Sequence, residues 1–172
     1  MADVSMTDAL VRRMVAYDAP DVRRVCHALK VFSYARMIAL EEGLSGRELA
    51  RLEAAAVLHD IGIHEAERKH GSAAGPWQEI EGPPVARGML EAAGADEAFA
   101  DRVCVLVGRH HTYSAIDGDD FRILVEADFL VNADEDAMSP EAIAAGERSL
   151  FRTKTGTALL RDLYPAAFTP RA

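Results

Sequence analysis

Cysteines and long hydrophobic runs are both scarce in this chain. The two cysteines, Cys26 and Cys104, lie far apart and form no CxxC pair, which argues against a disulfide framework and fits a reducing cytoplasm. No segment approaches about 18 consecutive apolar residues, and the opening MADVSMTDALVRR lacks a basic start followed by an apolar run. We therefore expect a cytoplasmic protein with no export signal and no membrane-spanning segment.

Positive charge is also in short supply. The chain has 19 basic and 28 acidic residues, a formal net charge of −9, which disfavours binding to a nucleic-acid polymer or to an anionic membrane surface. An anionic substrate would need positive charge supplied locally. With 172 residues, of which 49% are hydrophobic, the chain is suited to a single domain over residues 1–172.

The sequence contains no convincing strand pattern, and helical periodicity predicts an all-α fold. A segment from Gly62 to Pro84, rich in Gly and Pro, predicts a loop of about twenty residues. The expected helices run from a Thr7 cap to Asp18, from Pro20 to Glu42, from a Ser45–Glu48 capping box to His59, over 85–93, 96–111 and 120–132, and from Ser139 to about Pro165 with a break near Gly156.

Polar residues interrupt the apolar stripes of several predicted helices. His59 continues a stripe that contains Leu52 and Ala56. In the same way His110 follows Leu106 and Val107, Asp128 follows Leu124 and Val125, and His27 lies in a helix that is apolar nearly all round. Three separate helices thus place a metal-compatible side chain on an inward face, and His27 adds a fourth case.

Asp128 carries the strongest physical argument. A buried carboxylate needs a cationic partner, and no Lys or Arg stands three or four positions from it on its stripe. Imidazoles with carboxylates suit Zn, Fe, Mn, Co or Ni, and bridging carboxylates build two-metal sites. Alternatives exist for each residue, since a lone His is more often a hydrogen-bonded core residue, the His110–His111 pair suits a helix C-terminus, and Asp128 could pair with a distant Arg. The combination favours a metal site.

The sequence resembles the HD-domain superfamily of metal-dependent phosphohydrolases, over residues of about 20–135. The segments that carry the resemblance are VCHALKVFSYA, AAAVLHDIGIHEAE, VGRHH and LVEADFLVN. The resemblance implies a bundle of about five core helices, followed here by C-terminal helices over about 139–165. It also implies that His27, His59, Asp60 and Asp128 bind a divalent metal, with Asp60 nearest to a bridging role. His110 and His111 match histidines that two-metal members add.

The chain departs from the family pattern in two places. Two-metal members often carry a His in the segment that here reads WQEIEGPPVARGML, so Gln78, Glu79 or Glu81 would have to replace it, and Glu79 is our choice. Many relatives have Lys where this chain has Ile63, so that charge must come from elsewhere, with His64, Lys69 and His70 as candidates or a solvated loop face as the alternative. One or two ions per chain therefore both stay open.

The sequence thus predicts metal-assisted hydrolysis of a small phosphate ester, with a nucleotide as the expected substrate class. Mn, Co, Mg, Ni, Zn and Fe are all compatible, and Asp60, Glu65, Glu79 or His111 would handle the metal-activated water and its proton. Candidate phosphate contacts are Arg109, Arg148, Arg152 and Lys154, although a surface ion-pair face explains the last three more readily.

Two other functions and a possible assembly are compatible with the sequence. Some relatives use the same ligand set with two irons to activate oxygen, and a non-catalytic protein could sense a nucleotide through the same pocket. A homodimer is possible through the apolar first helix, with its face of Leu10, Val11, Met14 and Val15.

Overall fold

The computed structural model describes residues 5–169, so the ends of the predicted domain, 1–4 and 170–172, lie outside the described residues. All regular elements in the described range are helical, which confirms the all-α prediction. None of these helices is long and apolar enough to cross a bilayer. The elements are α1 (Met6–Asp18), α2 (Val22–Glu41), α3 (Gly46–Leu58), α4 (Ile63–His70), α5 (Gly75–Ala92), α6 (Glu97–Val107), η1 (Tyr113–Ala115), α7 (Asp119–Glu135), α8 (Pro140–Leu150), α9 (Lys154–Leu163) and η2 (Pro165–Ala167).

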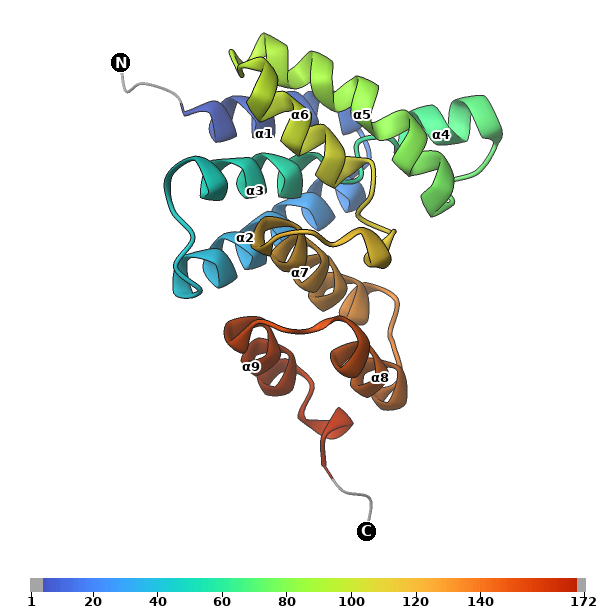
Figure 1. Cartoon of the computed structure of the whole chain (residues 1–172). Helices are drawn as coiled ribbons and strands as arrows, with labels where there is room; N and C mark the ends of the chain where they lie inside the picture. Colours follow the sequence, from blue (N-terminus) through green and yellow to red (C-terminus); the bar gives the residue numbers. More distant parts are fainter. Residues whose placement is uncertain (1–4, 170–172) are drawn as a thin grey trace.

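Helices α2 and α7 pack against each other at the centre of the molecule (Figure 1). Helix α3 packs against both of them and also contacts α1 and α6, so α1, α2, α3, α6 and α7 form the core that the sequence predicted. Each buries at least one large aliphatic side chain completely, and each such burial contributes about 1.5–3 kcal/mol. These side chains are Leu10, Ile38, Leu52, Leu106 and Leu124, all 0% exposed.

The apolar face of α1 packs inside the protein. Leu10 and Met14 are fully buried, whereas Val15 remains 39% exposed. The start of this helix corrects the prediction, because Ser5 is the N-cap and accepts a hydrogen bond from the Asp8 amide. Thr7, the predicted cap, instead donates its hydroxyl to Glu53 at 3.0 Å.

Two further helix starts differ from the prediction. Helix α2 begins at Val22 because Asp21, and not the region of Pro20, supplies the cap that accepts from the Arg24 amide. Ser45 is the N-cap residue of α3, but its side chain makes no capping hydrogen bond. Gly46 takes a φ of +52°, which turns the chain away from regular helix geometry and leaves the predicted capping box unformed.

The predicted loop over 62–84 is wrong, because this segment forms α4 and most of α5. Pro76 occupies the first turn of α5, where proline costs no hydrogen bond. Pro83 and Pro84 lie inside the helix, which is retained because α5 packs against α4 and α6. The carbonyl of Pro83 accepts from the Cys104 thiol of α6 at 3.5 Å.

The last helical region breaks at 151–153, earlier than the predicted break near Gly156. The cause is the fully buried Glu126 of α7. Its carboxylate accepts from the backbone amides of Arg152 and Thr153 at 2.7 and 3.0 Å, and also from the Thr153 hydroxyl. Thr153 then caps α9 by accepting from the Gly156 amide.

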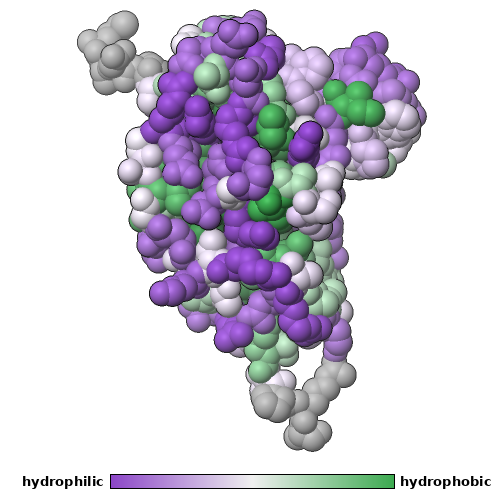
Figure 2. All heavy atoms as spheres, viewed as in Figure 1, coloured by the Kyte–Doolittle hydropathy of each residue, from purple (hydrophilic) through white to green (hydrophobic). Residues whose placement is uncertain are grey.

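The surface in Figure 2 is mostly hydrophilic, with hydrophobic side chains in small groups. This agrees with a chain whose 28 acidic and 19 basic residues lie largely outside the core. The exceptions are a small set of buried polar side chains, and four of them, His27, His59, His110 and Asp128, lie where α2, α3, α6 and α7 meet.

Candidate metal centre

Four segments bring histidines and aspartates together between the core helices. His27 comes from the second turn of α2 and Asp128 from the middle of α7. The pair His59–Asp60 lies in the turn after α3, and the pair His110–His111 lies in the turn after α6. The sequence predicted a helix over 96–111 that includes the last pair, and this is wrong because α6 ends at Val107. These segments meet because α2 packs against α3 and α7, and α3 packs against α6.

The predicted polar members of the apolar stripes are buried. His59 is 0% exposed, His110 is 2% exposed and Asp128 is 8% exposed. Such polar groups are stable in a protein interior only where partners satisfy them. The buried histidines and aspartates of this site are partnered mainly by one another.

One group of donor atoms is formed by His27, His59, Asp60 and Asp128. The Nε2 atoms of His27 and His59 lie 3.1 Å apart. Oδ1 of Asp128 lies 3.2 Å from His27 Nε2 and 3.6 Å from His59 Nε2. Oδ2 of Asp60 lies 3.6 Å from each of the two imidazole nitrogens.

Hydrogen bonds on the far side of each ring fix which nitrogens carry protons. His59 Nδ1 lies 2.9 Å from the Ala56 carbonyl oxygen, and His27 Nδ1 lies 3.0 Å from a Glu135 oxygen. Both partners are acceptors, so each Nδ1 carries the hydrogen and each neutral ring presents a lone pair at Nε2. Two lone pairs 3.1 Å apart, beside two carboxylate oxygens, require a cation or protons among them.

The spacing of these atoms fits a metal ion. Donors that each lie about 2.0–2.2 Å from one ion are separated from each other by about 3–3.5 Å. The shortest separations among the donor atoms, 3.1 and 3.2 Å, lie within this range, and the others, at 3.6 Å, lie just above it. His27, His59 and Asp60 therefore form a group that can hold a divalent cation.

Asp60, His110 and His111 form a second such group. Oδ1 of Asp60 lies 3.3 Å from His110 Nε2, while its other oxygen faces the first group. His110 donates from Nδ1 to the Val107 carbonyl at 2.9 Å, and its buried Nε2 makes no hydrogen bond within the described residues. An unsatisfied, buried ring nitrogen that faces a carboxylate oxygen is the arrangement expected of a metal ligand.

The pKa values of these side chains, in the protein without an ion, reflect the negative charge of the carboxylates gathered here. Burial opposes protonation of His27, but the hydrogen bond with Asp128 and the charge of Asp60 raise the pKa of His27 to about 9. Burial also works against charge on Asp60, yet His59 and His110 hold the pKa of Asp60 well below its usual range. The pKa of His111 is lowered by burial and by the neighbouring His110, so His111 stays neutral near pH 7.

Two residues that orient these donors were not predicted from the sequence. Glu135 accepts from His27 Nδ1 and also binds Lys30 Nζ at 2.9 Å. Asn132 donates its amide to Asp128 Oδ1 at 2.9 Å. Asn132 and Glu135 lie four and seven positions after Asp128, on the same face of α7. This spacing is the sequence signal that could have identified them.

The region where a family histidine is missing presents Gln78 to the site. Gln78 is buried, and its Oε1 lies 3.3 Å from His111 Nε2. Glu79, our choice from the sequence, instead accepts from the His111 amide at 3.1 Å and from the Thr112 hydroxyl at 2.9 Å, so it holds the turn that carries His111. Glu81 pairs with Lys69 and His70.

A cavity of about 280 Å³ opens beside the first group of donors. Arg23 is exposed at this cavity and makes no hydrogen bond or ion pair with residues of the described chain. Arg24 is held in place by Glu67 at 2.7 Å and His64 at 3.0 Å. The cavity is lined by Asp21, Arg23, Arg24, His27, Asp60, Ile63, Asn132, Glu135 and Asp136.

His64 connects the cavity to a buried carboxylate. Because Arg24 can only donate, His64 Nδ1 accepts from it and the hydrogen lies on Nε2, which is 3.3 Å from Asp18 Oδ1. Burial raises the pKa of Asp18 to about 6, and the neighbouring His64 and Arg24 oppose that rise. His64, Lys69 and His70 were the candidates to supply the positive charge that Ile63 lacks. His64 thus acts through Arg24, whereas Lys69 and His70 bind Glu81.

The remaining predicted site residues make no contact with these donors in the described structure. Glu65 pairs with Arg68 at 2.7 Å, which lowers the pKa of Glu65. Arg152 donates to backbone carbonyls at the end of α8. The side chains of Arg109, Arg148 and Lys154 are exposed. Their proposed roles with substrate stay predictions without a supporting contact.

Comparisons with known proteins agree with this architecture. The model of the HD domain family matches residues 24–145. The crystal structure of a predicted HD superfamily hydrolase from an uncultured Thermotogales bacterium is similar, with a TM-score of 0.63 and 26% sequence identity, covering 95% of this chain and 85% of that chain. A comparison with curated proteins gives no match.

Proposed function

Because this chain belongs to the HD domain family, we propose that it hydrolyses a small phosphate ester, a nucleotide being the expected class, with the help of one or two divalent ions. The observation that carries the proposal is the pair of imidazole nitrogens 3.1 Å apart, surrounded by carboxylate oxygens. Without an ion, a proton has to lie among these nitrogens and carboxylate oxygens, as the raised pKa of His27 indicates.

The residues that would hold the first ion are His27, His59, Asp60 and Asp128, and those that would hold a second are Asp60, His110 and His111. Asp60 fits a bridging role because its two oxygens face different groups. When bound, a divalent ion supplies activation of water near neutral pH and neutralises charge on phosphoryl oxygens. The neutral His111 is a further candidate to accept the proton of the attacking water, beside Glu65 and Glu79.

We propose Asp60→Ala as the decisive test, with Asp101→Ala as its matched control. Asp101 is an exposed carboxylate on α6 that pairs with Arg87. The Asp60 variant should lose bound metal and lose phosphatase activity by on the order of a thousandfold or more, because several kcal/mol of charge stabilisation disappear. Elemental analysis and a nucleotide phosphatase screen with Mn, Co and Mg measure both effects.

The outcome that contradicts the proposal is survival of metal content and turnover in the Asp60→Ala variant. Oxygen consumption under iron loading tests the di-iron oxygenase alternative in the same preparation, and we expect none. Tight nucleotide binding without turnover under every metal would instead support a sensor.

We also propose that Arg23 binds the phosphate of the substrate. It is the cation at the cavity that no carboxylate of the described residues neutralises, whereas Arg24 is engaged by Asp21, Glu67 and His64. Arg23→Ala should raise KM about tenfold or more, the effect of losing one charge-assisted hydrogen bond, with little change in metal content. Arg12→Ala, which removes an exposed cation of α1, is the control; equal kinetics in the two variants would reject this role.

A further inference from the structure

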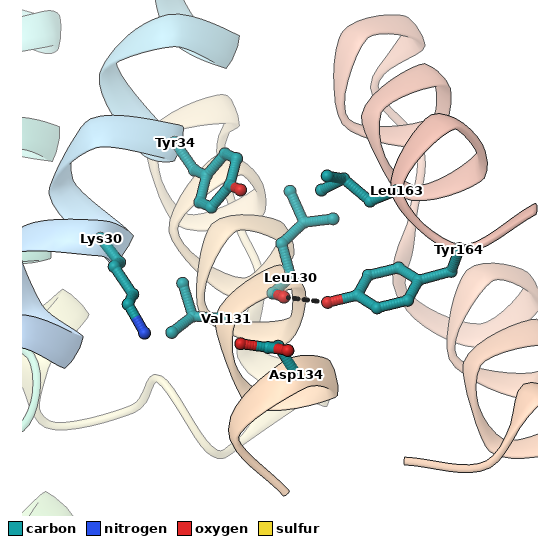
Figure 3. Close-up of a pocket in the computed structure, with 7 residues that line it drawn as sticks. All are labelled: Lys30, Tyr34, Leu130, Val131, Asp134, Leu163 and Tyr164. Carbon is teal, nitrogen blue, oxygen red and sulfur yellow. Dashed lines mark hydrogen bonds between the residues drawn. The ribbon is translucent and has the colours of Figure 1, made fainter. Parts of the chain in front are cut away.

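A second cavity, of about 350 Å³, lies between α2, α7 and the end of α9 (Figure 3). It shares no lining residue with the cavity beside the metal centre. Its volume lies within the range of small-molecule sites. The lining residues are Lys30, Tyr34, Leu130, Val131, Asp134, Leu163 and Tyr164.

The apolar and charged groups of this cavity are separated. Figure 3 shows the Lys30 ammonium and the Asp134 carboxylate along one edge, with Tyr34 and Leu163 toward the opposite edge. The Tyr164 hydroxyl donates to the Leu130 carbonyl at 3.0 Å, which satisfies that hydroxyl and fixes the ring as part of the wall. A ligand would thus meet apolar surface on one side and two opposite charges on the other.

Both charged groups retain capacity for a ligand. The Lys30 ammonium has three donors and uses one on Glu135 at 2.9 Å, and its side chain is 49% exposed. Asp134 accepts no side-chain hydrogen bond and forms no ion pair within residues 5–169. One edge of the cavity therefore offers a cation with free donors beside a carboxylate with free acceptors.

We infer that this cavity binds a small zwitterion with an apolar body, the chemical class of a free apolar α-amino acid. The ligand carboxylate pairs with Lys30, the ligand ammonium pairs with Asp134, and the apolar side chain lies among Leu130, Val131 and Leu163. A simple anion would meet repulsion from Asp134, and a simple cation would leave the remaining Lys30 donors without an acceptor. A ligand that carries both charges satisfies both groups.

This inference does not depend on phosphatase activity. Lys30 and Asp134 line this cavity, whereas His27, Asp60 and Glu135 line the other. Zwitterion binding should consequently persist in the Asp60→Ala variant, which removes the proposed hydrolysis. Failure of one proposal is therefore distinguishable from failure of the other.

Isothermal titration calorimetry with L-phenylalanine tests the site. The two matched probes are phenylpropionate, which lacks the ammonium, and phenethylamine, which lacks the carboxylate. We expect L-phenylalanine to bind, and each probe to bind about tenfold more weakly or worse, because each loses one charge-assisted pair. Absence of L-phenylalanine binding, or equal binding of the three compounds, would overturn the inference.

Asp134→Asn is the variant that tests the position of the site, and Asp162→Asn is its control. Asp162 is an exposed carboxylate on α9 that does not line the cavity. Asp134→Asn should weaken L-phenylalanine binding about tenfold while leaving phenylpropionate binding no weaker, because the carboxylate that repels it is gone. Equal L-phenylalanine affinity in both variants would place the ligand elsewhere and reject the site.

Discussion

Glu135 sets the chemical state of His27 although it is not itself a predicted ligand. Its carboxylate accepts the Nδ1 hydrogen of His27, which leaves Nε2 free for an ion, and Lys30 anchors the other carboxylate oxygen. A carboxylate behind a ligating imidazole both fixes the ring and raises its basicity. In the proposed metal site, the affinity for the ion would thus depend on a side chain outside the proposed ligand set.

We predict that Glu135→Gln weakens metal binding about 10–100-fold, the usual effect of losing such a carboxylate. Gln keeps an oxygen that can accept from His27 but carries no charge. Competition with a chromogenic chelator measures the affinity, and Glu91→Gln, at an exposed position of α5, serves as the control. An unchanged affinity in the Glu135 variant would mean that His27 does not ligate the ion.

Several residues of the candidate site were predictable from periodicity alone, and others were not. His59, His110 and Asp128 stand out because each interrupts an apolar stripe whose inward direction is fixed by helix geometry. Arg23 carries no such signal, because only the assembled bundle shows that the start of α2 borders the cavity. Arg152 shows the opposite case. It lies close in sequence to other cations and was predicted to contact phosphate, but its side chain binds backbone carbonyls at the end of its own helix.

At the scale of elements, the segment 62–84 shows where reading glycine and proline as helix breakers fails. The local preference of these residues for a turn is overridden by tertiary packing, because α5 packs against both α4 and α6. The glycines serve close packing instead. A Cβ on Gly62 would lie 2.6 Å from the Gly82 nitrogen and 2.7 Å from the Gln78 carbonyl oxygen, so the turn after Asp60 approaches the α5 backbone directly.

We predict that Gly62→Ala destabilises the protein by about 1–3 kcal/mol, because backbone atoms of α5 must move to admit the methyl group. Gly88→Ala is the control, since a Cβ there meets no atom within 4 Å and Gly88 lies in α5, the helix that Gly62 approaches. That control should be neutral or stabilising by up to about 1 kcal/mol. Urea denaturation monitored by circular dichroism measures both, and a Gly62 variant as stable as the Gly88 variant would contradict the packing described.

At the scale of the whole molecule, the electron-rich donors lie where the core helices converge. His27 from α2, His59 after α3 and Asp128 from α7 meet at separations of 3.1–3.6 Å. Without metal, the folded protein has to hold protons among these groups, as the raised pKa of His27 indicates. An ion at this point would therefore act as a link between three helices of the core and would stabilise the fold as well as the chemistry.

We predict that metal loading raises the melting temperature of the full chain. An ion at a hundredfold excess over its Kd stabilises the folded state by about 2.7 kcal/mol, and at about 2–4 °C per kcal/mol for a chain of this size the shift is about 5–10 °C. Differential scanning calorimetry of chelator-treated protein titrated with Mn measures it. Asp60→Ala should show little or no shift under the same titration, whereas an equal shift in that variant would mean that the stabilising ion binds away from the convergence of α2, α3 and α7.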